Sequence, residues 1–250
     1  MNPLQVTVSI CLIMTSVLLG FQVDRWSEDR RKQTQETVYL ERMKQDLVTD
    51  AANLQRRVEY FSDIQGFGLS SLAYLSAPEE ERVRGTKALV SFYLASHAWK
   101  FNPAISTFQE LKSSGNIPLI ESIELRNSFA VYYQELINAN YIWDAENFYR
   151  VTIRSLIPMP IQEIFWYECH DLSPQATRQT FNADCQPDIS PDEVLGIINK
   201  IETSPDVEGH LNYLLSNVTA SIDLFKGHRQ RALEIVELVD IQLEERSSQP

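Results

Sequence analysis

A long stretch without helix-breaking residues sets the strongest limit on the fold. Between Asp24 and Gly66 the sequence contains neither proline nor glycine. Apolar residues recur there at three- and four-residue steps: Leu40, Met43, Leu47, Ala51, Leu54, Val58 and Phe61. This spacing places them on one face of an α-helix. We therefore expect one continuous helix from Leu4 to about Gln65, on the order of 90 Å long.

The C-terminal part of the chain has a matching apolar stripe. Residues 204–206, Ser-Pro-Asp, are typical of a helix N-terminus and predict a helix that continues to Arg246. The stripe consists of Leu211, Leu214, Leu215, Val218, Ile222, Phe225, Ala232, Ile235, Val236, Val239 and Leu243. Two such stripes most simply bury each other. We expect an all-α fold in which the N-terminal helix forms a stalk and packs with the C-terminal helix in an antiparallel bundle.

The beginning of the chain is uncharged and mostly apolar. Residues 1–23 contain no charged side chain, and about 20 apolar residues can cross a hydrocarbon layer of roughly 30 Å as a helix. A buried core helix and a cleaved signal peptide are the alternatives, and no basic residue precedes the apolar run as a signal peptide requires. The residues expected at the membrane interface are Phe21, Arg25, Trp26, Arg30 and Arg31.

These patterns divide the chain along its sequence. We expect a transmembrane anchor at residues 1–23, a juxtamembrane and stalk helix at residues 24–76, and a helical domain at residues 77–250 that includes the long C-terminal helix.

Two features disagree on which side of the membrane the helical domain lies. Four cations within residues 25–32 follow the predicted span and none precedes it, which favours a cytoplasmic domain. Cys169 and Cys185, however, bound a segment rich in turn residues, which favours a disulfide and therefore an oxidising compartment. Two reduced, unrelated thiols are the alternative. We expect the domain to be extracytoplasmic, with a cytoplasmic domain as the alternative.

The charge balance and the motifs exclude several classes of function. There are 34 acidic and 22 basic residues, and a net charge of -12 repels nucleic acid. The nucleotide-binding and hydrolase motifs GxGxxG, Walker A, GxSxG and HExxH do not occur. Residues 168–171 with Asp184 and Cys185 offer zinc-ligating side chains, but their spacing differs from that of a paired CxxC site. We expect no enzyme activity, no cofactor and no metal.

A polar turn is the remaining candidate for a binding site. Residues 106–110 contain the pattern of a helix-capping box, and a glycine lies where a left-handed helix C-cap is expected. A partner or a small polar ligand could dock on the turn, or its residues could simply fix the corner between two helices. Its members are Glu110, Lys112, Ser113, Ser114, Gly115 and Asn116.

Three segments resemble one bacterial family. They are GFQVDRWSEDRRK, YLERMKQDL and FQELKSSGNIPLIESIELRNSFAVYY, within residues 12–140. The chain is similar there to membrane-anchored helical proteins that form a domain of unknown function. The resemblance implies a single-pass protein of the bacterial cytoplasmic membrane. Family members carry a basic leader before the span, which places the domain outside the cytoplasm; this chain has no such leader. The family implies no activity.

Together these observations favour a non-enzymatic interaction or scaffold protein at the membrane. Its expected partners are membrane lipids and another membrane or envelope protein. The N-terminal stripe could also form a parallel coiled coil, so a homo-oligomer is an open alternative to packing within the chain. A ligand-sensing helical bundle that acts through a membrane partner is the second hypothesis.

Overall fold

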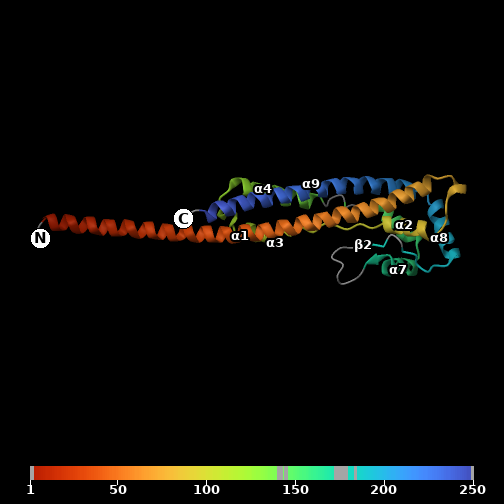
Figure 1. The fold of residues 1–250 in the computed structure, drawn as a ribbon, viewed down its shortest axis with the longest axis horizontal. Coiled ribbons are helices and arrows are strands. Elements are labelled where there is room, and N and C mark those ends of the chain that lie inside the picture. Colours follow the sequence, from red (N-terminus) through yellow and green to blue (C-terminus); the bar gives the residue numbers. More distant parts are fainter. Residues whose placement is uncertain (1–2, 140–142, 144–145, 172–179, 183–184, 249–250) are drawn as a thin grey trace. The chain divides into compact units, whose positions relative to one another are not determined.

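A computed structural model describes residues 3–139, 143, 146–171, 180–182 and 185–248 (Figure 1). The side chains of residues 3–11 and 13 are outside this description. The elements are α1 (Pro3–Ser76), η1 (Glu79–Glu81), α2 (Thr86–Ala95), α3 (Ser106–Ser113), η2 (Ile117–Leu119), α4 (Ile123–Asn138), α6 (Phe148–Leu156), α7 (Met159–Glu168), β1 (His170–Asp171), β2 (Thr180–Phe181), α8 (Pro191–Thr203) and α9 (Val207–Ser247). The expected all-helical architecture is confirmed.

The chain forms two compact units, and both long helices contribute to each. Unit 1 comprises residues 1–48, 104–130 and 234–250, and unit 2 comprises residues 49–103 and 131–233. The predicted division along the sequence, at residues 23 and 76, stays a prediction.

In unit 1, helices α1 and α9 pack together with α3 and α4. The buried residues are Leu40, Met43, Leu47, Leu111, Ile120, Leu125, Phe129, Ile235 and Val239. Lys44 Nζ lies 2.5 Å from Asp240 Oδ1 and joins the two long helices at the edge of this core. The buried Glu36 carboxylate accepts a hydrogen bond from the Glu121 backbone N–H at 2.8 Å and pairs with Arg246. The predicted packing of the N-terminal helix on the C-terminal helix is therefore confirmed.

In unit 2, the same two helices run antiparallel. The rings of Phe61 and Phe225 stack at 5.8 Å, and one turn farther along α1 the Gln65 side chain donates a hydrogen bond to Thr219 Oγ1 at 2.8 Å. Residue numbers thus fall along α9 as they rise along α1. The stripe residues that fall in this unit are buried within their own chain, as expected for intrachain packing.

Helix α1 is longer than predicted at its C-terminal end. It continues through Gly66 and Gly68 to Ser76, where the predicted stalk segment ends, whereas the apolar stripe predicts a continuous helix only to about Gln65. A Cβ atom at Gly68 would lie 2.7 Å from Leu215 Cδ2, so the missing side chain leaves room for α9 to pack closely. Glycine lowers helix propensity by about 1 kcal/mol, and packing against α9 outweighs that loss.

A small sheet departs from the purely helical expectation. Strands β1 and β2 pair antiparallel, with His170 opposite Phe181 and Asp171 opposite Thr180. Each strand has only two residues, too short for the apolar–polar alternation that would show a strand in the sequence.

The predicted transmembrane anchor is not supported by the described residues. Among them, no helix is both long enough and apolar enough to cross a membrane. The predicted span at residues 1–23 lies partly outside the description, because the side chains of residues 1–11 and 13 are not part of it.

Candidate functional site

Two buried histidines from distant parts of the sequence meet in unit 2. His97 follows the C-terminal end of α2, and His170 is the first residue of β1. Their Nε2 atoms are 3.0 Å apart, and the two residues are only 4% and 6% exposed. His97 Nδ1 lies 3.2 Å from the Leu94 carbonyl oxygen, and His170 Nδ1 lies 3.2 Å from the Phe165 carbonyl oxygen. The pair is thus held by two backbone oxygens and by its own mutual contact.

Arg154, on α6, lies directly beside this pair. Its Nη2 atom is 3.2 Å from His97 Nε2, and its Nη1 donates a hydrogen bond to the Tyr93 hydroxyl at 3.2 Å. Its Nε donates to Ser96 Oγ at 3.1 Å. The guanidinium group also lies over the Tyr93 ring, 4.3 Å from the centroid. These contacts hold a permanent cation against a buried imidazole.

Two further arginines and a tyrosine extend this group. Arg150 donates a hydrogen bond to the Ser96 carbonyl oxygen at 3.1 Å, and the Arg57 guanidinium lies over the rings of Tyr60 and Trp99. The Tyr60 hydroxyl is buried and has no hydrogen-bond partner among the described residues. We call Arg57, Tyr60, His97, Arg150, Arg154 and His170 the cationic cluster.

Burial makes this cluster electrostatically unusual. Burial lowers the pKa of His97 well below its usual value, and the neighbouring Arg154 lowers it further. Burial also lowers the pKa of His170. Both imidazoles are therefore neutral near pH 7. Within the part of the chain that the structure describes, no carboxylate forms an ion pair with Arg57, Arg150 or Arg154.

A disulfide holds the strand that carries His170. The structure joins Cys169, at the end of α7, to Cys185, with their Cα atoms 5.2 Å apart. The Asn182 backbone N–H also donates to the Cys169 carbonyl oxygen at 2.9 Å. The position of the second histidine is therefore fixed by its immediate neighbour in the chain. Asp184, one of the candidate zinc ligands, lies outside the described residues, and the described ones contain no group suited to hold a metal ion.

The predicted interaction turn, in unit 1, is organised by contacts of its own. Arg42 donates two hydrogen bonds to the Glu110 carboxylate, at 2.6 and 3.2 Å, and the Tyr39 hydroxyl donates a third at 3.0 Å. The Arg42 hydrogen bond, followed by that from Tyr39, lowers the pKa of Glu110. Gly115 adopts a left-handed φ of 73°, and the Asn116 N–H donates to the Leu111 carbonyl oxygen at 2.9 Å.

The two serine side chains of this turn fold back on the same helix. The hydroxyls of Ser113 and Ser114 donate to the Glu110 carbonyl oxygen, at 3.2 and 2.7 Å. Lys112 contributes its carbonyl oxygen, which accepts from the Gly115 N–H at 3.4 Å. These contacts favour a helix C-cap that fixes the corner, and binding at the turn stays a prediction.

The predicted interface residues lie on an exposed part of α1. Phe21 and Trp26 are each 61% exposed, and Arg25, Arg30 and Arg31 are exposed as well. Arg30 lies over the Trp26 ring, 4.9 Å from its centroid.

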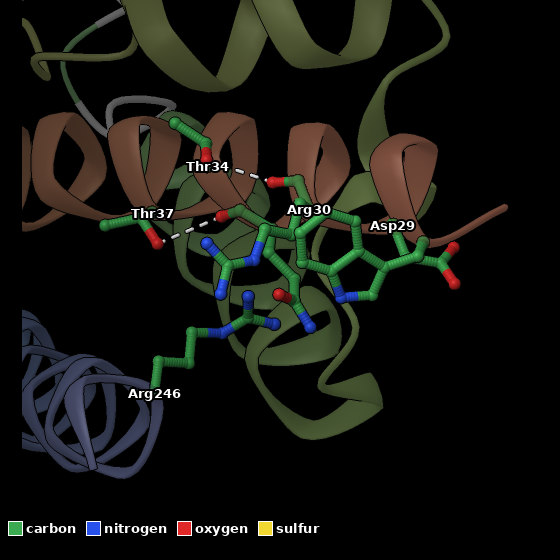
Figure 2. Close-up of a pocket in the computed structure, with 7 residues that line it drawn as sticks. Asp29, Arg30, Thr34, Thr37 and Arg246 are labelled. Carbon is green, nitrogen blue, oxygen red and sulfur yellow. Dashed lines mark hydrogen bonds between the residues drawn. The ribbon is translucent and has the colours of Figure 1, made fainter. Parts of the chain in front are cut away.

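A polar groove follows this region in unit 1 (Figure 2). It encloses about 540 Å³ and is lined by Trp26, Asp29, Arg30, Gln33, Thr34 and Thr37 of α1 and by Arg246 of α9. Figure 2 shows Arg30 and Arg246 reaching into it from the two helices. Arg246 Nη2 pairs with Glu36 and with Glu121, whereas its Nε and Nη1 have no described partner. The hydroxyls of Thr34 and Thr37 donate to their own helix at 3.0 Å.

Comparison with protein family models, with curated protein sequences and with solved structures found no match.

Only one part of the cationic cluster is visible in the sequence. The cysteines and His170 stand out as a local group, but His97 and Arg154 are 73 and 16 residues away from His170. No local pattern links them, because the cluster arises only when α2, α6 and β1 pack together. The one signal in the sequence is that His97 follows an apolar helical segment, which indicates that it is buried. Buried histidines of this kind are common in protein cores, so the signal does not indicate a site.

Proposed function

We propose that the chain is a single-pass membrane protein whose helical domain serves as an interaction or scaffold module. The observation that carries this proposal is the N-terminal part of α1. Its described apolar side chains are each at least half exposed: Leu12, Met14, Val17, Leu18, Leu19, Phe21, Val23 and Trp26. A helix that packs on one side buries one face, whereas this segment exposes apolar groups all round. A lipid environment would cover them.

The groove beyond this segment supports the same placement. Trp26 and Arg30 follow the predicted end of the span by three and seven residues, or about 5 and 10 Å at 1.5 Å per residue. This is the depth of the lipid headgroups, where tryptophan and arginine are favoured. Residues 21–31 would then anchor the start of the stalk at the membrane surface.

Insertion into the membrane is tested with charged substitutions in α1. Met14→Arg combined with Leu18→Arg adds two cations near the middle of the span, at about 3 kcal/mol each. We expect this variant to leave the carbonate-resistant membrane fraction. Val48→Arg, at another exposed apolar position of the same helix, is the matched control and should stay in that fraction. Full-length chain that is extracted by carbonate without any substitution would contradict the proposal.

We further propose that the helical domain lies outside the cytoplasm, with a cytoplasmic domain as the alternative. Support comes from the Cys169–Cys185 disulfide, because such bonds persist in oxidising compartments. An impermeant thiol reagent applied to cells expressing a Cys11→Ser variant should label the domain only after reduction. Labelling without reductant, and only after the membrane is broken, would place the domain in the cytoplasm.

The scaffold role rests on the predicted single span, on the long stalk helix and on the absence of a recognisable catalytic motif in the sequence. Crosslinking in native membranes followed by mass spectrometry should recover a reproducible membrane or envelope partner. Turnover of a metabolite by the purified protein, lost on changing one polar residue, would contradict this role.

A ligand-sensing bundle is the second candidate, and the cationic cluster favours it. Half-buried arginines without a described acidic partner are typical of sites that receive an anion. A thermal-shift screen of anionic metabolites tests this function, and a screen without any stabilising compound would count against it.

A further inference from the structure

The charges of the cationic cluster are unbalanced within the described chain. The protein as a whole carries 34 acidic residues and a net charge of -12, yet Arg57, Arg150 and Arg154 have no carboxylate partner among the described residues. Each is partly buried, and burial lowers the pKa of Arg57 and of Arg154. Removing a charge from water is unfavourable unless an opposite charge or hydrogen bonds replace the lost hydration. Hydrogen bonds to Ser96 and Tyr93 replace part of the hydration of Arg150 and Arg154, but no opposite charge among the described residues does. The arginines are therefore placed to gain from an added anion.

Tyr60 supplies an unused donor at the same place. The residue is 3% exposed, and its hydroxyl has no hydrogen-bond partner in the described structure. Its ring stacks on Phe181 at 5.2 Å, and the Phe181 ring in turn lies 5.2 Å from each of the two imidazoles. A buried hydroxyl without a partner is unfavourable by about 1–3 kcal/mol. An oxyanion beside it would accept its hydrogen.

A hydrogen count shows that the histidine pair is one proton short. Three contacts each need one hydrogen: His97 Nδ1 to the Leu94 oxygen, His170 Nδ1 to the Phe165 oxygen, and Nε2 to Nε2. Two neutral imidazoles carry one hydrogen each, so they satisfy two of the three. A third proton would complete the set, with His97 Nε2 then shared between His170 and Arg154 Nη2, which lies 3.2 Å away. That proton would also add a cation beside Arg154.

We propose that the cationic cluster binds a small ligand through a carboxylate or phosphate-type oxyanion, and that the His97–His170 pair takes up one proton from solvent as the anion binds. The oxyanion accepts hydrogen bonds from the guanidinium groups and from the Tyr60 hydroxyl. Its negative charge offsets Arg154, so the third proton on the imidazole pair is no longer opposed.

The charged and titratable groups that face the pair come from several elements. Arg150 and Arg154 face it from α6, and the Tyr93 ring of α2 lies 5.2 Å from the His97 ring. Both arginines and the second histidine disfavour protonation in the absence of an anion. This arrangement makes anion affinity rise as the pH falls.

This inference gives the ligand-sensing function a ligand class, and it does not depend on membrane anchoring. Every residue of the cluster belongs to unit 2. Failure of the carbonate-extraction test would leave it intact, and failure of anion binding would leave the anchor intact.

The test uses the full chain in detergent micelles and isothermal titration calorimetry. Sulfate, inorganic phosphate and succinate are titrated separately, with sodium chloride of equal ionic strength as the control for screening. Sulfate does not titrate near neutral pH, so any difference in its affinity between pH 6 and pH 8 comes from protonation of the protein. We expect sulfate to bind about tenfold more tightly at pH 6 than at pH 8. A tenfold change in affinity corresponds to about 1.4 kcal/mol.

Proton uptake is measured in the same experiment. Titrations in two buffers of different ionisation enthalpy should show up to one proton bound per anion at pH 6. Heats equal to those of sodium chloride would overturn the proposal, as would binding that is independent of pH. Preference for phosphate over succinate, or the reverse, identifies which oxyanion the site accepts.

Variants assign the effect to the cluster. Tyr60→Phe should weaken anion binding about tenfold or more, the usual loss for a hydrogen bond to a charged group. It removes a hydroxyl with no partner in the fold, so folding is preserved. Tyr149→Phe, which removes a buried hydroxyl bonded to the Phe92 oxygen at 3.2 Å, is the matched control and should leave binding unchanged. His170→Gln should abolish proton uptake. Equal affinity in wild type, Tyr60→Phe and Arg154→Gln would overturn the proposal.

Discussion

Removing the disulfide should lower the free energy of unfolding by an amount that depends on the number of residues between its two cysteines. Cys169 and Cys185 are 16 residues apart, and their bond closes a loop of that size. In the loop-entropy model the cross-link restricts the unfolded chain by about 10 cal/mol/K, or about 3 kcal/mol at 25 °C. Replacing both cysteines by serine should therefore lower the free energy of unfolding by about 3 kcal/mol.

Urea unfolding followed by tryptophan fluorescence measures this loss, and one of the four tryptophans lies close to the bond. The Trp166 ring lies 4.6 Å from the ring of His170, and His170 directly follows Cys169 in the sequence. With a urea slope of about 1–3 kcal/mol/M, a loss of about 3 kcal/mol lowers the midpoint by about 1–3 M. Wild-type protein kept in reductant should unfold at the same midpoint as the double serine variant.

Two results would refute this reasoning. Equal midpoints for the oxidised wild type and the double serine variant would show that the loop is not constrained by the bond. A Cys11→Ser variant serves as the control, since residue 11 lies outside the closed loop, and a comparable loss there would assign the effect to something other than the disulfide.

Three smaller perturbations test packing and pH dependence. Gly68→Val should destabilise unit 2 by about 1–3 kcal/mol, because its side chain would meet Leu215. Gly66→Ala, with nothing within 4 Å of the added Cβ, should instead stabilise by about 0.5–1 kcal/mol; urea midpoints of both variants decide, and a shift of the same sign would contradict the packing. Since the folded pKa values of His97 and His170 lie below the unfolded value of about 6.5, the unfolded chain binds more protons at acid pH. Stability measured without added anion should hold above pH 7 and fall as the pH drops through 6.5, and a flat profile from pH 7 to 5 would contradict the burial of the pair.

The course of the long helices follows from the sequence because its causes are local and periodic. The stripe from Leu40 to Phe61 repeats at the spacing of one helix face, and no proline interrupts it. The matching stripe in α9 predicts the antiparallel pairing, since each stripe needs a partner to bury it. Cys169 and Cys185 likewise stand at the ends of a turn-rich segment that the sequence makes visible.

Other features depend on packing and hydrogen bonds between segments that are distant in the sequence. Gly66 and Gly68 indicate a helix end when α1 is considered alone, but close packing of Leu215 carries the helix through both. The polar turn at residues 110–116 presents charged groups in the sequence, whereas in the fold Arg42 and Tyr39 occupy the Glu110 carboxylate.

The cationic cluster is the clearest case of a feature that only tertiary structure decides. His97 follows α2, Arg154 lies on α6 and His170 begins β1, and nothing in their sequence spacing brings them together. Local patterns record the periodicity of a helix face, because burial of that face acts on neighbours three or four residues apart. Local patterns do not indicate which end of α2 contacts which strand, because that contact depends on packing across the whole core. The architecture of long helices is therefore a property of the sequence pattern, and the meeting of two imidazoles with three guanidinium groups that have no carboxylate partner among the described residues is a property of the fold.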